Sequence, residues 1–159
     1  NGKSSVSELE KADIEMKTIR LKKNGLPRES MSFPGFKFLD ILNENWEESN
    51  FCDKIERKFL LIVFRIDADE IERLDMVGYW NMPYLDRLEA QRVWEDTKRR
   101  VAIDARNLPK LSESPIAHVR PKARDSRDTL PTPQGGEHVK QSFWLNSGYI
   151  AEIIKGLQA

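Results

Sequence analysis

The sequence Asp13-Ile14-Glu15-Met16-Lys17-Thr18-Ile19-Arg20 alternates charged and apolar side chains over eight residues. A period of two is typical of a β-strand, because successive side chains of a strand point to opposite faces of the sheet. Glu15 and Lys17 therefore share one face at a spacing of roughly 7 Å, and Ile14 and Met16 share the other. The alternation predicts a strand with one charged face and one apolar face.

Glu15 and Lys17 form a pair that can serve phosphodiester chemistry. A carboxylate can hold a divalent cation, and a neighbouring lysine can orient the attacking water or help to deprotonate it. The 15 Glu and 13 Lys among 159 residues produce the pattern Glu-x-Lys about once by chance, and it occurs twice. Considered alone, the pair fits the exposed half of an amphipathic strand better than a catalytic site, so its meaning depends on the rest of the chain.

The next part of the chain predicts a hairpin, two short helices and a central strand. Asn24-Gly25 is typical of a tight turn, so residues 28–33 are expected to return antiparallel to the first strand. Apolar spacing predicts a short helix over 38–46, and Ser49 can cap a second one through Lys58. The continuous apolar run 59–64 predicts a central strand covered on both faces.

The remaining part predicts a long helix, short strands and a closing helix. Pro83 suits a first helical position, and the helix is expected to end near Arg100. Its apolar stripe consists of Leu85, Leu88, Val93, Trp94 and Val101. A last strand is expected over 138–145, followed by a helix capped by Asn146 or Ser147. The order of elements predicts one α/β (α+β) domain over residues 1–159, with a mixed sheet flanked by helices.

The charges of this neutral chain are unevenly distributed. Residues 40–96 carry 15 acidic and 7 basic side chains, whereas the rest carries 11 acidic and 19 basic ones. If both ends of the chain meet in space, they form a positive face that suits a polyanion such as nucleic acid. The alternative is that the charges are scattered over a solvated surface.

A long basic segment stands out near the carboxyl end. Residues 120–136 contain three prolines and two glycines, which predicts a long and poorly packed loop. Long loops in compact domains are usually functional. Its basic residues are Arg120, Lys122, Arg124 and Arg127.

Other features exclude several classes of protein. Cys52 is the single cysteine, so no internal disulfide can form, and the chain is expected in the cytoplasm. His118 and His138 are too far apart in sequence to indicate a zinc cluster, and His118 is expected to make a structural hydrogen bond. The longest apolar run, 59–64, is far below the roughly 20 residues that cross a bilayer, so no membrane association is expected.

Several motifs in order resemble the MutH mismatch-repair endonucleases. The strand 15–19 and the turn 25–29 are similar to the Glu-x-Lys-Thr strand of that family and the turn after it. Further similar motifs follow in the same order at 46–49, 54–57, 120–122 and 143–145. The resemblance covers residues 8–157, almost the whole chain.

The chain resembles still more closely the GATC-cutting type II restriction enzymes of that family, which carry two copies of the domain. Motifs at 30–33, 36–38, 118–121 and 140–146 are most similar to the second copy. In that family the first copy cuts DNA, and the second binds another recognition site as an allosteric effector. The resemblance thus implies a carboxyl-terminal fragment of a longer enzyme, with an amino-terminal catalytic domain in the same protein.

The resemblance also implies roles for individual residues. The expected fold is a restriction-endonuclease-like core with two arms around double-stranded DNA and Mg²⁺ in the cleft. Glu15 is implied as a metal ligand, Lys17 as the catalytic lysine and Lys54 as an auxiliary lysine. The implied groove-reading loop contains Arg120, Pro121 and Lys122, and Trp144 replaces a tyrosine that lies against DNA. Phosphate contacts are expected from Arg124, Arg127 and Lys140, although Lys140 also fits a solvated surface lysine.

One position departs from the family pattern. The catalytic signature needs an aspartate seven residues before the glutamate, and Glu8 occupies that position. Glutamate can ligate Mg²⁺, but its extra methylene moves the carboxylate, and Mg²⁺ requires near-ideal octahedral geometry. Three hypotheses follow: a DNA-binding effector domain with little cleavage of its own, an active Mg²⁺-dependent endonuclease that uses Glu8 and Glu15, or a non-catalytic structural domain.

Overall fold

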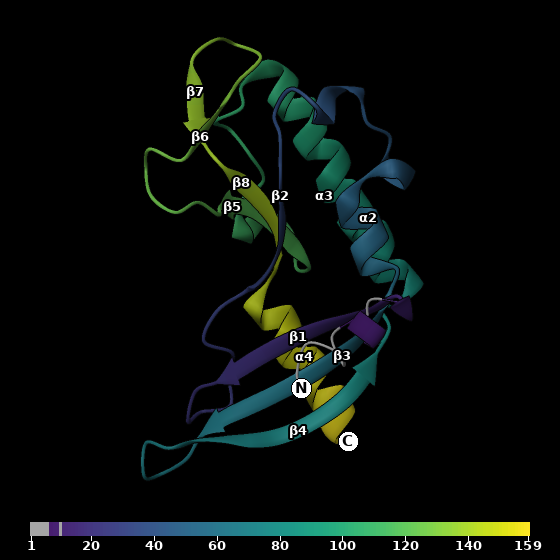
Figure 1. Cartoon of the computed structure of the whole chain (residues 1–159), viewed down its shortest axis with the longest axis vertical. Helices are drawn as coiled ribbons and strands as arrows, with labels where there is room; N and C mark the ends of the chain where they lie inside the picture. The colour runs from purple at the N-terminus through teal and green to yellow at the C-terminus, as the bar shows by residue number, and fades with distance from the viewer. Residues whose placement is uncertain (1–6, 10) are drawn as a thin grey trace.

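The computed structural model of the chain describes residues 7–9 and 11–159, and its amino-terminal half builds a mixed sheet (Figure 1). Strand β1 (Ile14–Leu21) pairs in parallel with β3 (Lys58–Ile66). Strand β3 pairs antiparallel with β4 (Glu72–Trp80), so the strand order is β1-β3-β4. This mixed sheet confirms the predicted α/β (α+β) class.

A second sheet is antiparallel and lies at the other end of the molecule (Figure 1). It contains β2 (Met31–Phe36), β8 (Gln141–Leu145) and β5 (Ala117–Pro121) in the order β2-β8-β5. A small hairpin of β6 (Thr129–Pro131) and β7 (Glu137–Val139) extends from it. Residues far apart in sequence thereby meet in one sheet.

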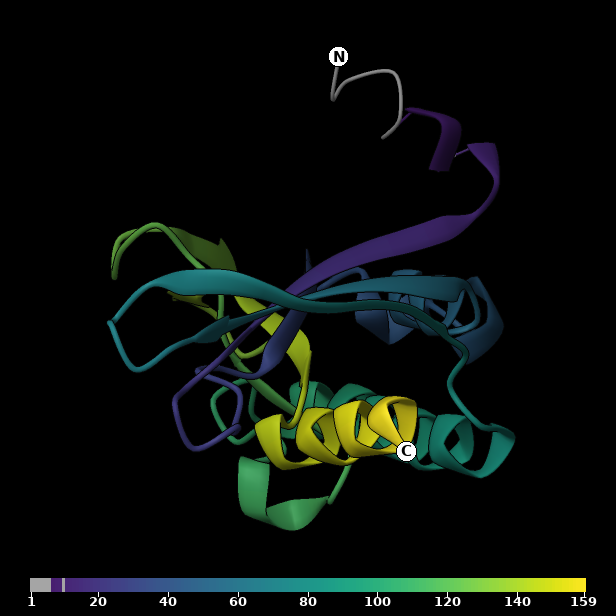
Figure 2. The same ribbon diagram turned by 90° about the horizontal axis from the view of Figure 1, so that it is seen from below.

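Helices pack against both sheets. Helix α4 (Ser147–Gln158) lies beneath the mixed sheet (Figure 2), and Tyr149 on it contacts Trp80 of β4 with ring centroids 6.0 Å apart. Helices α2 (Asn50–Ile55) and α3 (Tyr84–Ile103) accompany the second sheet (Figure 1). Short 3₁₀ turns are η1 (Ile41–Asn43), η2 (Trp46–Glu48) and η3 (Leu111–Glu113). No helix in the described residues has the length and apolar character needed to cross a membrane.

The predicted hairpin after β1 forms around its turn but is wrong beyond Arg28. The turn forms, because Gly25 adopts a positive φ of 83° and its N–H donates to the Lys22 carbonyl at 2.9 Å. Antiparallel contact then continues only as far as Arg28: a bridge joins Leu21 to Pro27, and the Arg28 N–H donates to the Arg20 carbonyl at 2.8 Å. The chain then leaves β1 for the second sheet, where Met31 and Phe33 become buried in the core. Burial of these side chains there is incompatible with continued pairing to β1.

The expectation that β3 is covered on both faces is also wrong. Phe59, Leu61 and Val63 are fully buried, whereas the alternating side chains of the other face are only partly buried. Exposed apolar side chains on β4 continue this outer face: Leu74, Val77 and Tyr79. A continuous apolar run therefore did not reveal that only one face of the strand is fully covered.

Two helical predictions need correction as well. The interval 38–46 contains η1 and the start of η2 instead of one short helix, although Trp46 is buried as expected. Helix α3 begins at Tyr84, so Pro83 is its N-cap and not the predicted first helical residue, and Leu85 in its first turn is 75% exposed. The buried stripe begins only at Ala90, because the first turns of α3 extend beyond the core.

Candidate nucleic-acid interface

Glu15 and Lys17 lie on the inward face of β1. The same face carries Ile19 and Leu21, which are buried, whereas Met16 on the opposite face is 40% exposed. The Glu15 and Lys17 side chains are only 17% and 20% exposed. The interpretation of the pair as the exposed half of an amphipathic strand is therefore wrong. Because partly burying charged groups is costly, their inward position is more typical of a site than of a solvated surface.

A third charged side chain joins this pair from α2. Lys54 Nζ lies 3.3 Å from Glu15 Oε2, and Lys17 Nζ lies 4.0 Å from Glu15 Oε1. Helix α2 is fixed by Ser49, whose Oγ accepts a hydrogen bond from the Cys52 N–H at 3.1 Å. The cap confirms the predicted role of Ser49 and anchors the helix that presents Lys54 to β1.

Lys17 also connects the two sheets. Its Nζ donates to the Ser32 carbonyl of β2 at 2.6 Å and lies 4.5 Å from the centre of the Phe33 ring. Lys122 approaches from the loop after β5 and donates to the Phe33 carbonyl at 3.1 Å. The strand β2 thus brings the side chains of Lys17 and Lys122 to neighbouring positions.

The environment lowers the pKa of Lys17. Burial contributes most, because it penalises the charged ammonium, and the neighbouring ammonium groups of Lys122 and Lys54 act in the same direction. The carboxylate of Glu15 opposes these effects and raises the pKa. A lysine in this setting is suited to orienting an anionic group or to exchanging a proton.

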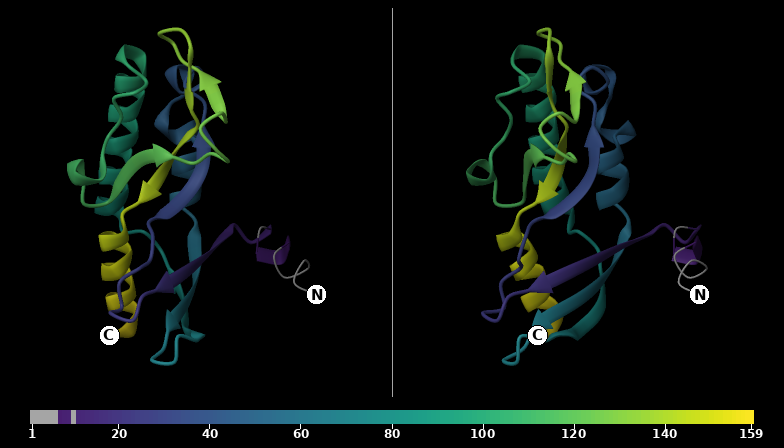
Figure 3. Two further views of the ribbon diagram at one scale, coloured as in Figure 1. Left: turned by 90° about the vertical axis from the view of Figure 1, so that its left-hand side faces the viewer. Right: turned by 60° about the vertical axis from the view of Figure 1, so that its left-hand side comes forward.

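The described residues around Glu15 do not fit a magnesium centre. Mg²⁺ prefers an octahedral set of oxygen ligands, and Glu15 is a single carboxylate in contact with two ammonium groups. Glu8 is exposed, and the turn that contains it stands off from both sheets (Figure 3). Within residues 7–9 and 11–159, no group of three His, Cys, Asp or Glu side chains could hold a metal ion. The implied role of Glu8 and Glu15 as a pair of metal ligands stays a prediction.

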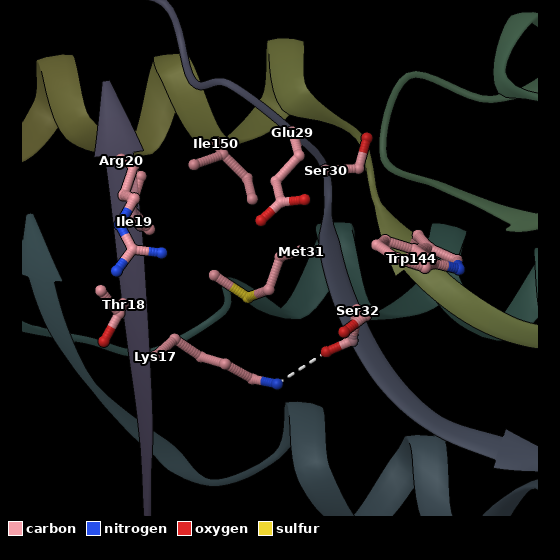
Figure 4. A pocket seen from close by; sticks show the side chains of 10 residues that line it. All are labelled: Lys17, Thr18, Ile19, Arg20, Glu29, Ser30, Met31, Ser32, Trp144 and Ile150. Carbon is pink, nitrogen blue, oxygen red and sulfur yellow. Dashed lines mark hydrogen bonds between the residues drawn. The ribbon is translucent and has the colours of Figure 1, made fainter. Parts of the chain in front are cut away.

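A crevice of about 170 Å³ opens between β1 and the second sheet beside Lys17 (Figure 4). Lys17 and Arg20 line it from β1, and Ser32 and Trp144 line it from β2 and β8. In Figure 4 Lys17 extends across the crevice to its hydrogen bond with Ser32. The predicted catalytic lysine and the predicted DNA-contacting tryptophan therefore border the same crevice.

Arg120 and Trp144 form a stacked pair on adjacent strands. The Arg120 guanidinium lies 3.9 Å from the centre of the Trp144 ring, and Trp144 Nε1–H donates to the Arg120 carbonyl at 3.3 Å. Stacking on an aromatic ring restricts a guanidinium without using its hydrogen-bond donors. This arrangement leaves Arg120 available for a planar acceptor such as a base edge.

The basic loop after β5 is held in place by Asp128. Its carboxylate contacts Lys140 at 2.9 Å and Arg124 at 3.5 Å, and it accepts the Arg124 backbone N–H at 3.1 Å. These partners lower the pKa of Asp128 to about 2, with the Lys140 hydrogen bond as the main cause. The expectation of a poorly packed loop holds for residues 121–127, which are all exposed, but one carboxylate and the β6-β7 hairpin give the segment a defined structure.

A basic hollow of about 680 Å³ lies between this loop and the end of β2. Its lining includes the apolar side chains of Phe36 and Leu130. Its basic lining residues are Lys37, Lys122, Arg124 and Lys140. Since Lys122 lines the hollow and also contacts Phe33, the hollow adjoins the cluster around Glu15.

Comparison with known proteins agrees with the motifs. The family described as DNA mismatch repair enzyme MutH matches residues 1–92, more than half of the chain. The chain belongs to the MutH family. It is 31% identical to the type II restriction enzyme Sau3AI of Staphylococcus aureus over an alignment of 198 positions. The alignment covers 96% of the chain and 40% of the enzyme. The resemblance to the MutH family drawn from the motifs is confirmed.

A second relative is the DNA mismatch repair protein MutH of Shewanella woodyi. It is 24% identical over 148 residues, which cover 89% of this chain and 64% of that protein. This MutH-family chain thus spans less than two thirds of the length of either relative. The two comparisons together place almost all of its sequence within the family.

The predicted site residues of this MutH-family chain fall into three groups. Glu15, Lys17 and Lys54 meet beside Lys122. Arg120 stacks on Trp144, and Pro121 ends β5 next to them. Arg124 and Lys140 share Asp128, whereas Arg127 is 89% exposed and pairs with Asp125.

Sequence reasoning missed two contributors to this site. Asp128 was not singled out, although it is the acidic residue that anchors the basic loop. The carbonyl groups of Ser32 and Phe33, which hold Lys17 and Lys122, also went unnoticed. Every residue has a backbone carbonyl, so the sequence does not indicate which carbonyls accept hydrogen bonds from lysines. An acidic residue within a basic loop, in contrast, is a signal that could have been used.

His118 is structural, as expected. Its Nδ1 lies 2.6 Å from Asn146 Oδ1, and both residues are buried. Burial lowers the pKa of His118, and the hydrogen bond to Asn146 partly offsets this effect. The neutral ring thus links the start of β5 to the residue before α4.

Proposed function

We propose that this chain is a sequence-specific double-stranded DNA-binding domain that recognises a GATC-like site. In this proposal it acts as the carboxyl-terminal allosteric effector domain of a type II restriction endonuclease. The observation that carries the proposal is the convergence of Lys17 and Lys54 with Lys122 of the basic loop. Lys17 comes from β1, Lys54 from α2 and Lys122 from the loop after β5, and Lys122 also lines the basic hollow.

Residues 1–159 form a single DNA-binding domain in this proposal, and its partner is an amino-terminal catalytic domain of the same protein. The support is the similarity to a type II restriction enzyme of which the chain spans 40%. Both domains would function in the cytoplasm. The effector role predicts that occupancy of the present domain by DNA alters the activity of its partner.

DNA recognition in this proposal uses two kinds of contact, one to phosphates and one to bases. Lys37, Arg124 and Lys140 border the basic hollow, where cationic side chains can bind phosphates and provide most of the affinity. Arg120 is held by Trp144 beside Lys122, where a guanidinium can donate to the O6 and N7 acceptors of guanine. Phosphate contacts would position the duplex, and Arg120 would read its sequence.

A competition experiment tests sequence recognition. The chain is titrated with a GATC-containing duplex and with a scrambled duplex of the same length at moderate salt. The proposal expects a clear preference for the GATC duplex, because only base contacts distinguish the two. Equal affinity for both duplexes would contradict it.

An active Mg²⁺-dependent endonuclease is the second candidate. The meeting of Glu15, Lys17 and Lys54 favours it, because the resemblance implies these residues for catalysis. The single carboxylate at the site argues against it. If the chain nicks or cuts a GATC duplex with Mg²⁺, and if Lys17→Ala abolishes this product, the second candidate replaces the first.

A purely structural domain would use the basic loop only to bind the acidic middle of the chain. The recorded ion pairs of Arg124, Arg127 and Lys140 are instead made to Asp125 and Asp128 of the loop itself. A salt-sensitive shift of duplex DNA in a gel would contradict the structural role. Absence of any shift at low salt would support it.

A further inference from the structure

The charges around Glu15 are unbalanced in favour of cations. Lys17, Lys54 and Lys122 bring three ammonium groups, and Glu15 is the one carboxylate that contacts this cluster in the described part of the chain. Lys17 and Lys54 are held in partly buried positions, with side chains 20% and 23% exposed, whereas Lys122 is exposed. The lysine cluster is therefore a preformed cationic site that Glu15 only partly neutralises.

The donors of the cluster exceed the acceptors that surround them. Each ammonium carries three N–H donors. The recorded acceptors are the carbonyls of Ser32 and Phe33 and the two oxygens of Glu15. The remaining donors are open to solvent, and an anionic oxygen can replace water there as a stronger acceptor.

We propose that the lysine cluster binds a phosphodiester group of duplex DNA directly, without a metal ion. The inference rests on the proposed DNA-binding function and assigns a ligand to one site within it. A metal centre needs several oxygen ligands with negative charge, whereas a phosphate needs several donors with positive charge. Lys17, Lys54 and Lys122 meet the second requirement, and the single Glu15 does not meet the first.

Glu15 then has the opposite role from that of a metal ligand. As a ligand it would attract Mg²⁺ and strengthen DNA binding through the metal. In a metal-free phosphate site its carboxylate competes with the phosphate for Lys17 and Lys54 and repels the incoming anion. Removing its charge therefore has opposite consequences for DNA affinity in the two cases.

The first test measures DNA affinity of the chain in EDTA for wild type and Glu15→Gln. Glutamine keeps the size of the side chain and removes its charge. We expect Glu15→Gln to bind a GATC duplex more tightly by about threefold or more, because one unit charge near the phosphate is removed. Unchanged or weaker binding by a folded Glu15→Gln variant would overturn the phosphate site.

Glu152→Gln is the matched control. It changes the net charge by the same amount, but Glu152 lies on α4, is 70% exposed and pairs with Lys155 at 3.3 Å. We expect its DNA affinity to stay close to that of wild type. Equal tightening by both variants would mean that the effect arises from overall charge, and it would overturn the inference. Thermal unfolding of each variant verifies that the fold is retained.

The second test replaces EDTA by Mg²⁺ at matched ionic strength. If the site is metal-free, Mg²⁺ does not increase the DNA affinity of wild type. Lys54→Met then binds DNA more weakly than wild type both in EDTA and in Mg²⁺. A gain with Mg²⁺ that disappears in Glu15→Gln would establish a metal centre and overturn the inference.

The two proposals fail in different ways. If wild type prefers the GATC duplex but Glu15→Gln does not tighten binding, the phosphate site is wrong and the DNA-binding function stands. If wild type binds no duplex at low salt, both proposals are wrong.

Discussion

At the scale of single residues, the stacking of Arg120 on Trp144 links structure to specificity. The ring restricts the guanidinium at 3.9 Å from its centre, so less conformational entropy is lost when the guanidinium binds a base. We predict that Arg120→Lys reduces the preference for the GATC duplex by about 1–3 kcal/mol, because lysine cannot donate through a planar fork. The ratio of the two duplex affinities measures this change.

Arg127→Lys provides the control for Arg120. Arg127 is 89% exposed and pairs only with Asp125 among its recorded ion partners. The same chemical change there is expected to leave the ratio of affinities unaltered. A loss of preference in Arg127→Lys equal to that in Arg120→Lys would show that the stacked pair has no special role.

The lowered pKa of Lys17 gives a second prediction at this scale. Its folded-state pKa lies below its unfolded value, so between these two pKa values the unfolded chain binds more protons than the folded one. The contribution of Lys17 to stability therefore rises as pH increases through this window. We predict that the unfolding free energy of wild type relative to Lys17→Met increases with pH toward the unfolded value of 10.5. Chemical denaturation at several pH values tests the direction.

Lys155→Met is a suitable control for this experiment. Lys155 is 73% exposed on α4, and its recorded ion partner is Glu152. The difference in unfolding free energy between wild type and Lys155→Met should change little over the same pH range. If the difference in unfolding free energy between wild type and Lys17→Met does not change with pH, burial does not disfavour the Lys17 ammonium.

At the scale of elements, the basic loop depends on Asp128. Its side chain is 10% exposed, and its low pKa keeps it charged until the pH falls toward about 2. We predict that Asp128→Asn exposes the loop to trypsin, with cleavage after Lys122, Arg124 or Arg127 accelerated several-fold at neutral pH. Mass spectrometry of the early fragments identifies the cleaved bonds.

Asp125→Asn is the matched control for the loop. Asp125 lies in the same segment, but its side chain is 49% exposed and pairs with the exposed Arg127. Its cleavage rate should stay near that of wild type. Similar acceleration in both variants would mean that any loss of negative charge loosens the loop and that Asp128 is not its anchor.

The elements also show what sequence could and could not predict. The period of two around Glu15 and Lys17 correctly predicted β1, but a period of two does not tell which face is inward. The turn at Asn24-Gly25 was local and therefore visible. The sequence did not reveal the parallel pairing of β1 with β3, because it joins Ile14 to Lys58 across β2, two 3₁₀ turns and α2.

The site was predictable to a similar extent. The family resemblance implied roles in one site for Glu15, Lys17 and Lys54, and these three side chains are in contact in the structure. The position of Lys122 beside them depends on the carbonyl of Phe33, which no side-chain pattern encodes. Long-range backbone contacts of this kind become visible only in the folded chain.

At the scale of the whole molecule, a neutral chain gathers part of its positive charge on one surface. The net charge is zero, yet the lysine cluster and the basic hollow share Lys122 and form one basic surface. Local charge governs contacts with a polyanion, because salt screens charges that are farther away than about 10 Å at 0.1 M ionic strength. Net charge alone would therefore underestimate the affinity of this chain for DNA.

The salt dependence of DNA binding tests this arrangement. Each phosphate neutralised by a lysine or arginine contributes about −0.9 to the slope of log affinity against log salt. Four to six contacts from the lysine cluster and the basic hollow would give a slope of roughly −4 to −5. We predict that Lys122→Met reduces the magnitude of this slope by about one or more, whereas Lys155→Met on α4 leaves it unchanged. A slope near zero for wild type would mean that the basic surface does not contact the phosphate backbone, whatever the sequence preference of the chain.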